Sequence, residues 1–123
     1  MNTLLIYLSG SLTIIWGISH LFPTRSVVRS FGDISRDNQR IITMEWIIEG
    51  ITLIFIGILT IGITFTDPEA VTAKFVYGLV VVMLISLAVV SLFTGFKVNF
   101  LPYKLCPLIF TTSAVLILAA MIL

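Results

Sequence analysis

The chain has 123 residues, of which 59% are hydrophobic and only 11% are charged, and its formal net charge is +1. A soluble domain of this size must cover its core with polar surface, and this chain has too few polar side chains to do so. The composition therefore excludes a small soluble domain and indicates an integral membrane protein.

Four long apolar runs follow one another along the chain, over residues 3–22, 41–65, 75–96 and 105–123. Roughly 20 helical residues cross the ~30 Å hydrocarbon layer of a bilayer, so each run is long enough for one span. No basic segment precedes the first run and no small-residue cleavage site follows it, which favours a span over a cleaved signal peptide. We therefore predict an all-α polytopic membrane protein, a four-transmembrane-helix bundle in a single domain over residues 1–123.

The loop after the first run contains the segment SVVRSFG, residues 26–32. Proline at position 23 ends the first helix, because it lacks the backbone N–H that helical continuation needs. Valines and a phenylalanine then fall on one side of a short predicted interfacial helix and arginines on the other, with Gly32 at its end. This helix either anchors the loop in the membrane interface or covers a site as a lid.

Polar residues and prolines near the run boundaries predict where the later helices begin. Asp37 is a candidate N-cap for the second long helix. The segment TDPEAV predicts a start for the third, with Thr66 or Asp67 as N-cap and Pro68 in the first turn. Pro107 is expected in the first turn of the fourth helix, where proline is tolerated.

Basic residues are distributed unevenly between the loops. Loops 24–40 and 97–104 hold six of the seven basic side chains, namely Arg25, Arg29, Arg36, Arg40, Lys97 and Lys104. Cytoplasmic loops collect Lys and Arg, so we expect these two loops inside the cell and both termini on the extracytoplasmic side. The same asymmetry predicts contact with anionic membrane lipids. No aromatic-and-basic pattern of a nucleic-acid module is present, so no nucleic-acid partner is expected.

Two glutamates, Glu45 and Glu49, interrupt the apolar segment ITMEWIIEGITLIF, residues 42–55. An acid deep in a span costs on the order of 2.5–3.5 kcal/mol, so both are expected to face the bundle interior. Their spacing of four places them on one helix face. His20, Lys97 and Lys104 are the candidate cationic partners. The pair either performs acid/base chemistry or clamps helices together.

We predict a hydrogen bond between His20 and Glu45 across the first two long helices, and a cavity beside Glu49 as the proton-handling group. Candidate catalytic residues are therefore Glu49, Glu45 and His20. Four further polar or aromatic side chains are candidate substrate-binding residues, namely Thr13, Trp16, Asn99 and Tyr103. The first two share a helix face with His20, and the last two follow the third span.

No cofactor or metal is expected. A single histidine cannot supply a two-histidine haem site within one chain. Metal binding by His20, Glu45 and Glu49 has no ligand-spacing motif to support it. The lone cysteine, Cys106, excludes an internal disulfide.

In outline the chain resembles the DoxX-like group of small membrane proteins, through its four spans, its length and a glycine followed by a polar residue late in the first helix, Gly17 to His20. The resemblance covers the whole chain as architecture only. It implies a bacterial-type plasma (inner) membrane protein with links to redox or quinone chemistry, and it assigns no functional residue.

Two classes of function follow. In the first, the protein binds a lipophilic small molecule such as a quinone, or transforms it by acid/base chemistry at a polar cluster in the cytoplasmic half of the bundle. In the second, the cluster only holds helices together, and the protein is a non-catalytic accessory or scaffold subunit that forms a homo-oligomer. A proton-coupled transporter of small molecules using Glu49 is a further alternative, and whether the protein is an enzyme stays open.

Overall fold

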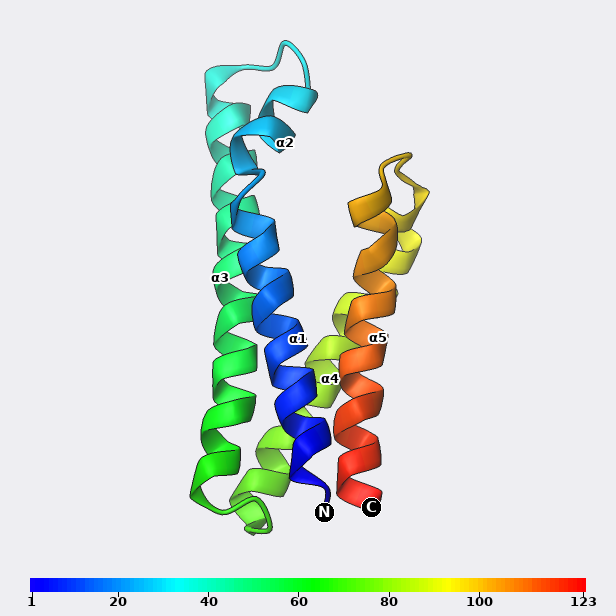
Figure 1. The fold of residues 1–123 in the computed structure, drawn as a ribbon. Helices are drawn as coiled ribbons and strands as arrows, with labels where there is room; N and C mark the ends of the chain where they lie inside the picture. Colours follow the sequence, from blue (N-terminus) through cyan, green and yellow to red (C-terminus); the bar gives the residue numbers. More distant parts are fainter.

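The computed structural model describes all 123 residues, and its regular structure is entirely helical (Figure 1). The elements in chain order are α1 (Thr3–Leu21), α2 (Thr24–Ser30), α3 (Arg36–Thr66), α4 (Val71–Phe93), the short 3₁₀-helix η1 (Gly95–Lys97) and α5 (Leu101–Ile122). Helices α1, α3, α4 and α5 are each long and apolar enough to cross a membrane. The predicted all-α bundle of four spans is therefore confirmed, and the predicted short helix in the first loop is present as α2.

Helix α3 begins five residues before the predicted boundary at 41, and its cap differs from the prediction. Ser35, not Asp37, is the N-cap, and its hydroxyl accepts a hydrogen bond from the Asn38 N–H at 3.2 Å. Asp37 lies in the first turn instead, where a negative charge complements the helix dipole. With 31 residues, α3 is about 46 Å long and exceeds the ~30 Å hydrocarbon layer.

The starts of the last two helices also differ from the predictions. Neither Thr66 nor Asp67 caps α4: α3 continues through Thr66, and the Asp67 carboxylate accepts from the Glu69 N–H at 3.0 Å to form the turn before Val71. Pro107 lies inside α5 rather than in its first turn, because α5 already begins at Leu101, with Pro102 in the first turn. Several local signals compete at each helix end, so a single capping residue or proline does not locate the boundary.

The long helices form two antiparallel pairs, α1 with α3 and α4 with α5, which join mainly where α1 packs on α5 (Figure 1). Both chain termini lie at one end of the bundle, and α2 and η1 lie at the other. Hydroxyl groups reinforce these contacts. The Ser9 hydroxyl donates to the Ser113 carbonyl of α5 at 2.9 Å, and the Thr64 and Tyr77 hydroxyls join α3 to α4 at 2.9 Å.

Four glycines set the contact between α1 and α3. Gly10 faces Gly57 and Gly17 faces Gly50, and the two glycines of each helix are seven positions apart. A Cβ atom on Gly57 would lie 2.5 Å from the Gly10 carbonyl oxygen, and one on Gly17 would lie 2.7 Å from the Gly50 oxygen. The two backbones are therefore in direct contact, as small residues allow in membrane helices. This contact determines which residues of α1 and α3 lie side by side.

Candidate functional site

His20 lies in the last turn of α1 and is 7% exposed. Its Nε2 atom is 3.4 Å from Oε1 of Glu49 on α3, whose side chain is 40% exposed. The face of the His20 ring stacks on the Trp46 indole, with ring centroids 4.5 Å apart and an interplanar angle of 22°. A buried imidazole is thus held between a carboxylate and an aromatic ring.

The partner of His20 is Glu49 rather than the predicted Glu45. The Gly17–Gly50 contact explains the difference. Helices α1 and α3 are antiparallel, so a step of three residues forward from Gly17 corresponds to a step of three residues back from Gly50. This register places His20 between Trp46 and Glu49. Glu45, one turn further on, passes beyond the end of α1.

Glu45 is exposed, so the expectation that both glutamates face the interior is wrong for this residue. It borders a shallow depression lined by isoleucines, Trp46 and Glu49. Helix α3 is longer than the hydrocarbon layer is thick, so one end of it extends beyond that layer. Glu45 lies nine residues from the start of α3, about 14 Å along the axis, and can therefore reach the headgroup region. The cost of burying its charge therefore does not arise.

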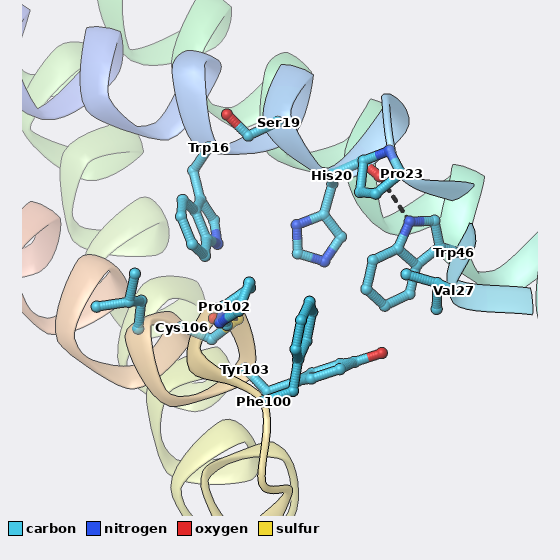
Figure 2. Close-up of a pocket in the computed structure, with 11 residues that line it drawn as sticks. Trp16, Ser19, His20, Pro23, Val27, Trp46, Phe100, Pro102, Tyr103 and Cys106 are labelled. Atoms are coloured by element: carbon cyan, nitrogen blue, oxygen red, sulfur yellow. Dashed lines mark hydrogen bonds between the residues drawn. The ribbon is translucent and has the colours of Figure 1, made fainter. Parts of the chain in front are cut away.

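Trp46 is a site residue that the sequence predictions missed. Its indole N–H donates to the His20 carbonyl oxygen at 2.6 Å, drawn as the dashed line in Figure 2. That carbonyl belongs to the last turn of α1, where backbone oxygens lack partners within the helix. The signal available in the sequence was the tryptophan between the two glutamates of MEWIIEG, residues 44–50.

An aromatic pocket of about 220 Å³ lies beside His20, between the end of α1 and the start of α5 (Figure 2). It is lined by Trp16, Ser19, His20, Pro23, Val27, Trp46, Phe100, Pro102, Tyr103, Leu105 and Cys106. The Tyr103 ring meets Trp46 edge to face at 5.7 Å, and Phe100 meets Tyr103 at 5.9 Å. Rings from α1, α3 and α5 therefore form most of the pocket wall.

A second hollow of about 320 Å³ lies on the Glu49 side of His20, between α3, α4 and α5. It is lined by His20, Glu49, Leu87, Val90, Ser91, Thr94, Gly95, Tyr103 and Cys106. His20, Tyr103 and Cys106 border both this polar hollow and the aromatic pocket. The imidazole therefore lies between the two spaces, together with a phenol and a thiol.

The remaining predicted site residues divide into two groups. Trp16 and Tyr103 line the aromatic pocket, as a substrate-binding role requires. Thr13 does not: it is buried between α1 and α5, where its hydroxyl donates to the Ser9 carbonyl at 2.9 Å and lies 3.4 Å from the Ser113 hydroxyl of α5. Asn99 is exposed and borders neither the aromatic pocket nor the polar hollow.

The indole nitrogen of Trp16 is buried and has no oxygen or nitrogen acceptor within the protein, and the Cys106 thiol is the polar group beside it. A buried donor without a partner costs roughly 1–3 kcal/mol, so such groups call for an explanation. Because the Trp16 side chain lines the aromatic pocket, a ligand oxygen can supply the missing acceptor.

No three His, Cys, Asp or Glu side chains lie close enough together to form a metal site. The chain matches no protein-family model, no curated protein sequence and no solved structure.

Proposed function

We propose that the protein binds a lipophilic molecule with a flat, oxygen-bearing ring, such as a quinone, in the aromatic pocket, and that His20 and Glu49 exchange a proton with its polar end. One observation carries the proposal. His20 is buried, its ring lies in the wall of the aromatic pocket, and its Nε2 atom is 3.4 Å from the Glu49 carboxylate.

The size and lining of the aromatic pocket support a ring-shaped head group. Sites for drug-sized ligands measure roughly 300–1,000 Å³, so a pocket of about 220 Å³ accommodates a ring and leaves a long tail outside, in the surrounding lipid. The Trp46 and Tyr103 rings offer faces and edges for aromatic stacking. The Trp16 N–H, which has no oxygen acceptor within the protein, supports an oxygen substituent on the bound ring.

The exposures of the two ionisable groups support proton exchange. The Glu49 side chain is 40% exposed and borders the polar hollow, whereas His20 is buried between that hollow and the aromatic pocket. Glu49 can therefore exchange a proton with water, and His20 can pass it to or from the ligand. An exposed acid that exchanges protons with water and a buried imidazole beside the ligand together suit general acid/base chemistry on a carbonyl or hydroxyl group.

Ligand binding can be measured directly, because the chain has two tryptophans and both line the aromatic pocket. Titration of the detergent-solubilised protein with decyl-benzoquinone should quench their fluorescence saturably, while an alkyl cyclohexanediol of equal chain length should not compete. We expect Tyr103→Ser to weaken probe binding by about tenfold, through the loss of aromatic contact.

The matched control is Tyr7→Ser. Tyr7 is a half-buried tyrosine that packs on Phe65 near the opposite end of the bundle, with ring centroids 5.4 Å apart. Quenching that rises linearly without saturation, or that weakens equally in both tyrosine variants, would contradict a ligand site at the aromatic pocket.

We further propose that the protein lies in a bacterial-type plasma membrane with α2 and η1 on the cytoplasmic side. Lys74 is the one basic side chain near the opposite end, and it pairs with Glu69 at 2.8 Å. Its hydrogen bond is the main cause that lowers the pKa of Glu69, so the acid stays ionised and offsets the lysine charge. The other six basic side chains leave the α2 end strongly positive, which supports this orientation.

Tags test the orientation. A reporter inserted between Asp33 and Asp37 should be cytoplasmic, and one placed after Leu123 should be extracytoplasmic. A variant that combines Arg25→Glu and Arg29→Glu at the α2 end with Thr72→Lys at the other end should reduce or invert the preference for this membrane orientation. A cytoplasmic C-terminal tag on the unaltered chain would contradict the orientation, and would leave the aromatic pocket facing the other leaflet.

A further inference from the structure

Four arginines of the first loop surround two adjoining hollows between α2 and the first turns of α3. One hollow, of about 480 Å³, is lined by Thr24, Arg25, Val28, Arg29, Gln39 and Thr43. The other, of about 460 Å³, is lined by Val28, Arg36, Gln39, Arg40, Thr43 and Met44. Because three residues border both hollows, they form one surface, which we call the arginine cradle.

The positive charge of the arginine cradle is largely unneutralised within the chain. Only Arg40 has an acidic side chain within 4 Å, namely Asp37 at 3.6 Å, and both side chains are highly exposed, at 75% and 86%. Such an exposed ion pair contributes little. Arg25, Arg29 and Arg36 form no ion pair, so three guanidinium groups remain available to an anion.

The donors of the arginine cradle favour a phosphate group. The Thr24 and Thr43 hydroxyls already donate to the carbonyls of Leu21 and Gln39, both at 2.7 Å. The free donors are therefore the guanidinium groups and the Gln39 amide. Guanidinium presents a planar fork of N–H groups that binds phosphate through two parallel hydrogen bonds, and the cradle contains no lysine.

The apolar surroundings indicate that the phosphate carries hydrocarbon chains. Helix α2 is held in place by buried Val27, and four large apolar side chains near the arginine cradle are exposed, namely Phe22, Phe31, Ile41 and Met44, at 85%, 52%, 52% and 50%. These residues lie where α1 ends and α3 begins, which is where apolar spans leave the hydrocarbon layer and meet lipid phosphates. A soluble phosphate compound has no hydrocarbon chains to contact these exposed apolar side chains.

We propose that the arginine cradle is a binding site for the phosphate head group of an anionic phospholipid, whose acyl chains lie along the exposed apolar side chains at the α1–α3 end of the bundle. The proposal is independent of the aromatic pocket and its ligand. It concerns a retained lipid held by α2 and α3, as distinct from general attraction between a basic loop and an anionic membrane surface.

The test uses the full chain in a neutral maltoside detergent, titrated with dihexanoylphosphatidylglycerol as the anionic probe and dihexanoylphosphatidylcholine as the zwitterionic one. Affinity is read from the concentration dependence of the melting temperature. Arg25→Gln with Arg29→Gln, and separately Arg36→Gln with Arg40→Gln, should weaken binding of the anionic probe by at least about tenfold.

The matched control is Lys97→Gln with Lys104→Gln, which removes two positive charges at the same end of the bundle but outside the arginine cradle. We expect it to change the affinity by less than about twofold. The double variant Arg25→Lys with Arg29→Lys keeps both positive charges but removes the planar pair of N–H donors, and it should also weaken binding of the anionic probe.

Three results would overturn the proposal. An equal loss of affinity in the lysine control would show general attraction to positive charge. Equal binding of the zwitterionic probe would show that the acyl chains alone are recognised. Displacement of the lipid by inorganic phosphate at the same concentration would assign the arginine cradle to a soluble phosphate compound instead. Circular dichroism of each variant verifies that it is folded.

Discussion

Glu49→Gln is expected to slow proton exchange with a ligand in the aromatic pocket by roughly 10²–10⁴-fold, the contribution typical of general acid/base catalysis, while ligand binding is retained. The amide keeps the size of the carboxylate and can hydrogen-bond to His20 Nε2, which lies 3.4 Å away, but it cannot carry a proton. The measurement is a pH jump with an alkyl-hydroxynaphthoquinone in the pocket, because the absorbance of this probe reports whether its hydroxyl is ionised.

Glu45→Gln is the matched control for this substitution. Glu45 is the same residue type, one turn away on α3, but it is exposed and does not contact His20. We expect the control to leave the exchange rate unchanged and His20→Gln to reproduce the loss. A normally folded Glu49→Gln protein with unchanged exchange would remove the case for acid/base chemistry and favour the scaffold interpretation.

Gly57→Ala and Gly17→Ala are each expected to destabilise the protein by about 1–3 kcal/mol, the usual cost of adding atoms to a closely packed contact. In Gly57→Ala the new methyl group would lie 2.5 Å from the Gly10 carbonyl oxygen. Because this neighbour is backbone rather than the end of a flexible side chain, helices α1 and α3 must separate. Unfolding by sodium dodecyl sulfate, followed by circular dichroism, measures the change.

Gly62→Ala is the control on the same helix, since a Cβ atom there meets no other atom within 4 Å. Alanine favours helix over glycine by up to about 1 kcal/mol, so this variant should be neutral or slightly more stable. Gly17→Ala should also weaken probe binding, because Gly17 is one turn from His20 and determines its distance from Glu49. Equal stability of Gly57→Ala and Gly62→Ala would contradict a backbone contact between α1 and α3.

The sequence alone determined the fold class and the number of spans. Its four apolar runs are each long enough to cross a bilayer, and a helix satisfies its own backbone hydrogen bonds there. The energetic cost of polar groups in a membrane likewise identified His20 and Glu49 as candidates before their positions were known. The short helix α2 followed from its local pattern of valines, arginines and a final glycine, all within one segment.

Only the tertiary structure decided which of these residues meet. Residues 45 and 49 occupy one face of one helix, so no local pattern distinguishes them as partners of His20. The choice depends on the register between α1 and α3, which the backbone contact between Gly17 and Gly50 sets. The same register brings Trp46 onto the His20 ring, and the packing of α1 on α5 buries Thr13 away from the aromatic pocket. Side-chain chemistry is local to the sequence, whereas the pairing of helices depends on close contacts between segments far apart in the chain.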